Sequence, residues 1–531
     1  MALFGRNNRQ NTDTLILYGS KSGNAKKVAQ LAQKYLMKNG HKTSFVNIKK
    51  YSPENLQRVQ HLLVIISTHG EGDPPPAAKG FFKEVLSNNM SSLAHLKYSV
   101  CALGDSSYRL YCEAGRKMDN RLKELNAKPF YPRTECDVDF SASAVKWIKG
   151  SCQQLNGSCK INGNDIIENK ALSKATYHAR LVNKKVLSAG NTKKLCYHIE
   201  LKTEHRDINF KPGDSIEILP ENPTWLVEKI LNITGIELGN CVNGNKNLSS
   251  KLLKELEITS ISERTLRKYH EKVNNKILTS LLETPRELSA YLTCANVLDM
   301  LTDFNSTSFS ISDLEDILPP VRYRQYSIAS GQKNCTSVEL TIKPVKYLYK
   351  DSWHEGAASN YLCHTLDIGT SISFRLFRNP DFYLPKVLSL PVIMIANGTG
   401  IAPFRAFLQQ RETLGLIGKT WLLFGERCSY SDFYYKEEMV AFQQNGVLEK
   451  LNVAFSRDRE QKVYVQDIIE EKSDELLNWL QDGAHIYVCG SLKMGKSVMK
   501  VLNAMLRGKK VEGISGVENL ISLCRYHEDV Y

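Results

Sequence analysis

Two stretches of this 531-residue sequence alternate short apolar runs with amphipathic helical segments, one stretch towards each end of the chain. In the first stretch, the apolar run at 15–18 is followed by a helix-like segment at 25–39, and further apolar runs lie at 62–66 and 98–103. Strands that alternate with helices predict a parallel sheet covered by helices on both faces. Ligands of such folds bind beyond the carboxyl ends of the strands.

A β-rich block separates the two stretches. Apolar runs such as 195–201 and 338–342 predict one antiparallel barrel, which a mostly helical segment at about 223–318 interrupts. The segment before the barrel is rich in Gly, Ser, Asn and Lys, as flexible linkers are. We therefore predict an α/β multidomain protein. Its expected parts are a doubly wound domain at 1–149, a linker at 150–174, the barrel with its insertion at 175–388 and a second doubly wound domain at 389–531.

The composition argues against several classes of protein. The 13 cysteines form no CxxC pair, so we expect reduced thiols and no zinc, iron–sulfur or other metal site. The net charge of +14 would suit nucleic acid, but the lysines are spread along the chain without a nucleic-acid motif, so we expect no such partner. No apolar run is long enough for a signal peptide or membrane anchor, which predicts a cytoplasmic protein.

Three polar loops follow strands of the first predicted sheet. The segment 20–25 reads Ser-Lys-Ser-Gly-Asn-Ala and leads into a helix, where hydroxyl and backbone N–H groups can cradle a phosphate. Alone, this segment is equally well explained as a helix cap with a tight turn. The segments 67–75 and 103–112 end at the same edge of the sheet, and Tyr108 and Tyr111 could stack on a flat ring.

Together the three loops resemble the flavodoxin-like FMN-binding domain of the diflavin reductase family, over nearly the whole of the first 148 residues. Family members commonly have Thr where Ser22 stands and Gln where His69 stands. Ser22 keeps the hydroxyl, whereas His69 could alter the hydrogen bonding or the potential of the flavin. The resemblance implies FMN contacts by Ser20, Lys21, Ser22, Gly23, Asn24, Ala25, Ser67, Thr68, His69, Gly70, Leu103, Gly104, Asp105, Tyr108, Tyr111 and Cys112.

The barrel block resembles the FAD-binding part of the same family. Residues 324–327 read Arg-Gln-Tyr-Ser, like the family's RxYS motif, in which the arginine pairs with the pyrophosphate and the tyrosine packs on the isoalloxazine. Residues 356–359 resemble its second phosphate loop. Each signal is weak alone, but their order along the chain is specific. The implied FAD contacts are Arg324, Gln325, Tyr326, Ser327, Thr341, Ile342, Lys343, Tyr347, Gly356, Ala357, Ala358, Ser359 and Tyr531.

The last block carries a glycine loop after a buried strand. Residues 396–405 resemble the family's GxGTGIAPFR segment, whose glycines bring backbone amides to a pyrophosphate. Asn397 stands where a proline is common, which leaves the stiffness of this loop open. Two further segments, 456–457 and 462–466, resemble the part that grips the 2′-phosphate, and they imply NADPH over NADH. The implied NADPH contacts are Gly398, Thr399, Gly400, Ser456, Arg457, Lys462, Tyr464 and Gln466.

The resemblance also implies a catalytic set. Cys489 matches the family's nicotinamide-facing cysteine, and Asp529 matches the acidic partner of Ser327 and Cys489. In the family an aromatic residue covers the FAD ring and swings aside for the nicotinamide, a role that Tyr531 fits. These residues would align the partners for hydride transfer from NADPH to FAD N5, since the flavin carries the redox chemistry. Ser497 departs from the family, which commonly has an acidic residue there.

The resemblance implies electron flow from NADPH through FAD and FMN to a protein acceptor. It is strongest to the flavoproteins of NADPH–sulfite reductase, so the expected acceptor is a haemoprotein subunit, and the oligomeric state is open. One alternative is a general reductase for another haem or iron–sulfur protein. Another is a flavin-binding scaffold without turnover, which the unusual His69, Asn397 and Ser497 motivate.

Two further expectations concern the acceptor. Carboxylates near the flavin loops could guide a complementary partner, or could be ordinary surface charge. If FMN serves both FAD and an outside acceptor, its domain should move on the linker. The carboxylates in question are Glu71, Asp73, Asp105, Asp137 and Asp139.

Overall fold

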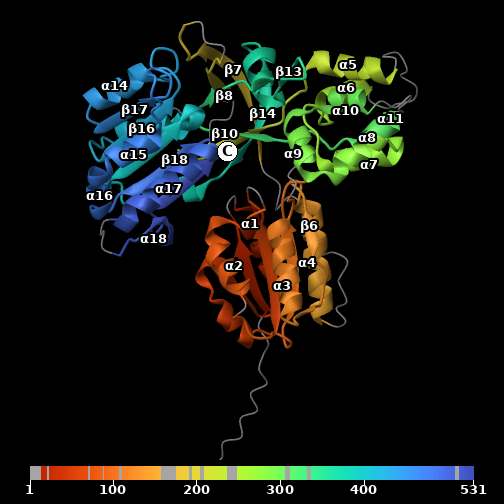
Figure 1. Ribbon diagram of the computed structural model, residues 1–531. Coiled ribbons are helices and arrows are strands. Elements are labelled where there is room, and N and C mark those ends of the chain that lie inside the picture. Colours follow the sequence, from red (N-terminus) through yellow and green to blue (C-terminus); the bar gives the residue numbers. More distant parts are fainter. Residues whose placement is uncertain are drawn as a thin grey trace, which may run out of the picture. The chain divides into compact units, whose positions relative to one another are not determined.

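In the computed structural model, the chain folds into two compact units (Figure 1). The first unit comprises residues 1–174 and 261–288, and the second comprises residues 175–260 and 289–531. The structure describes residues 14–20, 23–69, 72–87, 89–106, 110–156, 175–190, 194–203, 208–235, 248–304, 311–331, 336–508 and 513–531.

A parallel sheet of strand order β2-β1-β3-β4-β5 forms the centre of the first unit, and β6 also pairs with β4. The apolar side chains of each central strand alternate between two cores. Helices α1 and α4 cover one face, and α2 and α3 cover the other. The strands are β1 (Thr14–Gly19), β2 (Thr43–Asn47), β3 (His61–Ser67), β4 (Lys97–Leu103), β5 (Lys128–Pro129) and β6 (Thr134–Cys136). The helices are α1 (Asn24–Lys38), α2 (Lys79–Val85), α3 (Glu113–Glu124) and α4 (Ser141–Asn156), with α7 (Glu263–Val273) and α8 (Lys276–Glu283) also assigned to this unit.

The second unit begins with an antiparallel sheet of strand order β10-β9-β14-β7-β8-β11. A bridge between Ile328 and Leu340 joins the two outer strands, which closes the sheet into a barrel around an apolar core. The strands are β7 (Thr176–Val186), β8 (Tyr197–Thr203), β9 (Ser215–Ile218), β10 (Arg324–Ser327), β11 (Ser337–Ile342) and β14 (Ser371–Phe377), with a hairpin of β12 (Lys346–Tyr349) and β13 (Ser352–Glu355). Helices of this part are α5 (Thr224–Thr234), α6 (Leu248–Lys254), α9 (Pro285–Cys294), α10 (Val297–Asp303), α11 (Ile311–Ile317) and α12 (Ala357–Asn360).

A second parallel sheet, of strand order β17-β16-β15-β18-β19, completes the second unit. Helices α13 and α14 pack on one face, and α15 to α18 pack on the other. The strands are β15 (Val392–Asn397), β16 (Thr420–Glu426), β17 (Lys450–Phe455), β18 (His485–Gly490) and β19 (Tyr526–Val530). The helices are α13 (Ala402–Thr413), α14 (Lys436–Gln444), α15 (Val465–Glu471), α16 (Ser473–Gln481), α17 (Leu492–Gly508) and α18 (Val517–Ser522).

The predicted fold class is confirmed: a doubly wound domain, a barrel interrupted by helices and a second doubly wound domain follow one another. One predicted boundary needs correction, because α4 continues to Asn156 and residues 150–156 are helical rather than linker. Ser151 and Cys152 are buried on this last turn, so packing against the sheet extends the helix beyond its polar composition. Residues 157–174 lie outside the described part of the chain. No helix among the described residues is long and apolar enough to cross a membrane.

Candidate functional site

The predicted phosphate loop lies where β1 meets α1. Ser20 Oγ accepts a hydrogen bond from the backbone N–H of Ala25 at 3.2 Å, which begins the first turn of the helix. Gly23 has φ +80°, a left-handed conformation that favours glycine, and stands directly before Asn24. The predicted contacts Lys21 and Ser22 lie outside the described residues.

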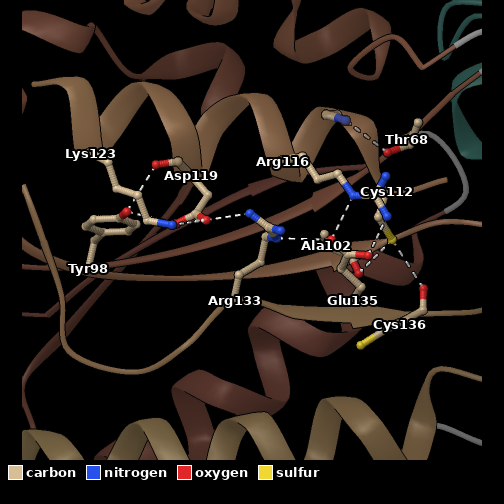
Figure 2. A network of polar contacts seen from close by, with 11 residues as sticks. Thr68, Tyr98, Ala102, Cys112, Arg116, Asp119, Lys123, Arg133, Glu135 and Cys136 are labelled. Carbon is tan, nitrogen blue, oxygen red and sulfur yellow. Dashed lines mark hydrogen bonds and ion pairs between the residues drawn. The ribbon is translucent and has the colours of Figure 1, made fainter. Parts of the chain in front are cut away.

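The second and third loops follow β3 and β4 at the same edge of the sheet. Thr68 donates its backbone N–H to Leu103 O at 2.8 Å, and its Oγ1 accepts from Ala114 N at 3.2 Å (Figure 2). His69 and Asp73 exchange two backbone hydrogen bonds, of 2.8 and 2.9 Å, which close a tight turn. The hydroxyl of Ser67 bonds to the backbone of the β1 end. The predicted contacts Gly70 and Tyr108 lie outside the described part, as does Glu71.

The third loop closes back on itself at Gly104. A Cβ on Gly104 would lie 2.7 Å from Cys112 N, so only glycine allows this close approach. Ser106 donates both its backbone N–H, at 3.0 Å, and its hydroxyl to the carboxylate of Asp137. Asp137 therefore holds Ser106, a role for which the sequence offered no signal because the partners are 31 residues apart.

A charged network that includes Arg116 lies next to Tyr111. Figure 2 shows this network without the Tyr111 ring. Arg116 donates two hydrogen bonds to Glu135, of 2.9 and 2.8 Å, and its guanidinium carbon lies 5.9 Å from the centre of the Tyr111 ring. Burial raises the pKa of Tyr111, so its phenol stays protonated. Arg133 lies between Glu135 and Asp119, which also accepts a hydrogen bond from Tyr98. The network thus runs from Arg116, beside the ring that is predicted to face FMN, to Tyr98 near the start of β4.

In the barrel, the predicted pyrophosphate arginine has a partner that sequence reasoning missed. Arg324 Nη2 donates to Glu257 Oε2 at 2.8 Å, and the Glu257 side chain is only 5 % exposed. A guanidinium has five N–H donors, so this pairing orients Arg324 and leaves donors for an anion. Gln325 bonds to Glu217 at 3.3 Å, and burial raises the pKa of Tyr326.

The second predicted phosphate loop contacts Val345, the residue before β12. Ser359 Oγ accepts a hydrogen bond from Val345 N at 3.0 Å, and Gly356 donates its N–H to Val345 O at 2.9 Å. A Cβ on Gly356 would lie 2.9 Å from Val345 Cβ. Ala357 and Ala358 are buried in the first turn of α12, which begins here. Tyr347, on β12, donates its hydroxyl to Cys294 O at 3.0 Å.

Three predicted FAD contacts on β11 and just after it have other surroundings in the structure. Thr341 Oγ1 bonds to Tyr435 OH at 2.7 Å, and Lys343 Nζ donates to Glu426 Oε1 at 2.6 Å. These bonds join the barrel to the second parallel sheet. Ile342 is buried in the barrel core. Their assignment to FAD stays a prediction.

The glycine loop of the second sheet runs from β15 through a 3-10 turn, η7 (Gly398–Ile401), into α13. Gly398 has φ +57°. A Cβ on Gly400 would lie 2.1 Å from Cys489 O, so glycine is required for the loop to approach β18. The hydroxyl of Thr399 and the helix that starts at Ala402 fit the pyrophosphate of a dinucleotide.

The predicted 2′-phosphate residues lie beside the end of β16. Ser456 donates its N–H to Glu426 O at 3.0 Å, and the exposed Arg457 donates its N–H to Arg427 O at 2.8 Å. Lys462 is exposed as well, and Tyr464 is 45 % exposed. Gln466 is in the first turn of α15. Exposed cations next to the glycine loop are a suitable donor set for a phosphate monoester.

The predicted catalytic residues come together at the carboxyl ends of β18 and β19. Ser327 Oγ donates to Asp529 Oδ2 at 3.3 Å, although the two residues are 202 positions apart. Cys489 is buried and pairs directly with Asp529 across the two strands. Tyr531 is 59 % exposed, and its OH bonds to Thr399 Oγ1 at 2.7 Å. The structure thus joins the barrel serine to the glycine loop of the second sheet.

Comparisons with known proteins agree with this arrangement. The family model for flavodoxin matches residues 16–146, the FAD binding domain model matches 170–361 and the oxidoreductase NAD-binding domain model matches 394–500. These three domains, in this order, define an NADPH-dependent diflavin reductase, an oxidoreductase that uses FAD and FMN.

Curated relatives narrow the class. The chain is 33 % identical to the sulfite reductase (NADPH) flavoprotein alpha-component of Bacillus subtilis, over 98 % of this chain and 89 % of the relative. It is 32 % identical to the same component from Buchnera aphidicola (Schizaphis graminum), over 99 % and 90 %, and from Vibrio vulnificus, over 97 % and 87 %. The chain belongs to the family of sulfite reductase flavoprotein alpha-components.

Proposed function

We propose that this reductase delivers its electrons to the haemoprotein subunit of a sulfite reductase. The observation that supports this acceptor is the similarity to the alpha-components along nearly the whole chain. The proposed site of hydride transfer in this chain is supported by the cluster of Ser327, Cys489 and Asp529 next to the Gly398–Ile401 turn.

The residues of this cluster would position the nicotinamide and the flavin. Bound FAD would supply the redox chemistry that couples NADPH oxidation to one-electron reduction of FMN. Asp529 accepts a hydrogen bond from the Ser327 hydroxyl, and this bond fixes the direction in which the lone pairs of the Ser327 oxygen point. Gly400 lets the loop pack directly on the backbone of Cys489, and Thr399 would offer a hydroxyl to the dinucleotide.

The docking face for the acceptor is proposed to lie on the first unit, around the flavin loops. The structure changes the part that acidic residues can play there, since Asp137 is bonded to Ser106 and to the backbone of Val138. The carboxylate of Asp137 therefore already has partners within the first unit, while the exposed Asp139 remains a candidate for guiding a complementary partner.

An anaerobic NADPH titration of the FMN- and FAD-reconstituted protein tests the reductase chemistry. We expect both flavins to lose their visible absorbance as NADPH is added. NADH at the same concentrations serves as the control for recognition of the 2′-phosphate, and should reduce the flavins far less. Absorbance that stays constant under excess NADPH would instead support a flavin-binding scaffold without turnover.

Reconstitution with a sulfite reductase haemoprotein subunit tests the acceptor. We expect NADPH-dependent formation of sulfide only when both proteins are present. Rapid reduction of a generic haem protein such as a cytochrome, together with no sulfide, would favour a general haemoprotein reductase and contradict the proposed acceptor.

A further inference from the structure

The turn between β18 and α17 is held by a side chain of the glycine loop. We define this turn as residues 489–491, which are the last two residues of β18 and the single residue before α17, and it carries the thiol of Cys489. Asn397, at the end of β15, binds it at two points. Its Oδ1 accepts the backbone N–H of Ser491 at 2.8 Å, and its Nδ2 donates to Ser491 Oγ at 3.2 Å.

The contact leaves no free space between loop and turn. Gly490 has φ +138°, and a Cβ there would lie 2.1 Å from Asn397 Oδ1. A Cβ on Gly400 would lie 2.1 Å from the carbonyl oxygen of Cys489. The backbone of the turn is therefore in direct contact with both ends of the loop, and a displacement at Asn397 would also displace Cys489.

Tyr531 holds the opposite side of the same turn. Its backbone N–H donates to Gly490 O at 3.0 Å, and its carbonyl accepts from Leu492 N at 3.1 Å. Its hydroxyl returns to the loop through Thr399. Loop, turn and Tyr531 thus form a closed ring of hydrogen bonds, in which Asn397 makes the direct side-chain link from loop to turn.

The backbone of Asn397 explains why this residue differs from the common proline. Its φ is −134°, which a proline ring, fixed near −65°, cannot adopt. Here the loop is restrained by side-chain hydrogen bonds instead of by a ring. We propose that Asn397 is a positioning residue for the nicotinamide site: its carboxamide fixes the 489–491 turn, and through it Cys489 and Tyr531, against the dinucleotide loop. This inference rests on the proposed hydride-transfer site.

Thiol labelling of the flavin-loaded protein tests the position of the turn without turnover. In Asn397→Ala, we expect iodoacetamide to alkylate Cys489 at least about 10-fold faster than in the wild type, because local opening becomes easier. Two other thiols serve as internal controls in the same digest. The exposed Cys524 should be labelled equally in both proteins, and the fully buried Cys196 should stay unlabelled. Asn503→Ala, which removes a 2.9 Å bond to Val517 N in the same domain, is the matched control and should leave Cys489 protected.

Steady-state kinetics provide the second readout. In Asn397→Ala we expect kcat with NADPH to fall about 10-fold, with KM changed less than about 2-fold and a larger primary isotope effect from NADPH deuterated at C4, because misplaced reactants slow the chemical step. Asn397→Asp keeps an oxygen acceptor for Ser491 N and can accept from Ser491 Oγ, so it should restore kcat to within about 3-fold of the wild type.

The outcomes separate this inference from the proposed function. If wild-type flavins are reduced by NADPH but Asn397→Ala matches the wild type in Cys489 labelling and kcat, the positioning role is wrong and the reductase assignment stands. Labelling of Cys196 together with Cys489 would also overturn it, since that result indicates general loosening. If the wild type itself shows no NADPH-driven reduction, the proposed function fails first.

Discussion

The hydroxyl of Tyr531 bonds to a residue that is also predicted to contact NADPH. Thr399 belongs to the glycine loop, and its Oγ1 lies 2.7 Å from Tyr531 OH. A dinucleotide phosphate that used the Thr399 hydroxyl would have to compete with this bond. At the scale of single residues, the site therefore contains a contact that dinucleotide binding should break.

Tyr531→Phe should bind NADP⁺ about 2- to 10-fold more tightly than the wild type, because one hydrogen bond, worth about 0.5–1.5 kcal/mol, no longer competes. Equilibrium titration of the FAD-loaded protein measures this affinity. Tyr531→Ala, which also removes the ring, serves for comparison. An unchanged or weaker affinity in Tyr531→Phe would mean that the Thr399–Tyr531 bond does not oppose binding.

At the level of secondary structure, strand β8 of the barrel contacts the start of helix α14 through a partly buried histidine. His198 Nδ1 lies 3.1 Å from Tyr435 OH, and the side chain is 12 % exposed. Burial, followed by the charge of Arg405, lowers the pKa of His198 to about 4. Arg405 itself bonds to Glu438 and to Glu339 on β11, so a charged histidine here would add a cation to a crowded junction.

Acidification should weaken this junction. Because the pKa of His198 is lower in the folded chain than in the unfolded chain, its contribution to stability is complete above about pH 6.5 and is lost as the pH falls towards 4. Between pH 7.5 and pH 4.5, we expect the denaturant concentration at the midpoint of unfolding to fall less in His198→Gln than in the wild type. His485, whose pKa is also lowered to about 4, is present in both proteins and cancels in the comparison. Equal losses would show that His198 is not the group that titrates.

At the scale of the whole molecule, the chain consists of two compact units that each contain a parallel sheet and its own cores. The chain passes from one unit to the other at 174–175, in the segment between α4 and β7, and again at 260–261 and 288–289. An FMN that exchanges electrons with both FAD and an outside protein requires freedom between the units.

Deletion of residues 161–170 should slow electron delivery to a protein acceptor while leaving the FMN content and the NADPH reduction of FAD unchanged. A variant in which the same residues are replaced by Gly and Ser at equal length controls for composition, and should retain the wild-type rate. Stopped-flow absorbance separates flavin reduction from acceptor reduction. Wild-type acceptor rates in the deletion variant would contradict the need for linker length.

The fold class could be predicted from apolar periodicity, which is a local pattern. The three cofactor-binding blocks were predicted from short motifs that resemble those of the diflavin reductase family. The approach of Ser327 to Asp529 also matches its motif-based expectation. Tertiary structure alone decided which partners complete the sites: Glu257 for Arg324, Asp137 for Ser106 and Ser491 for Asn397. It also extended α4 to Asn156. These contacts join residues far apart in the chain, and no local pattern encodes a pairing that arises only when strands and loops are brought together by folding.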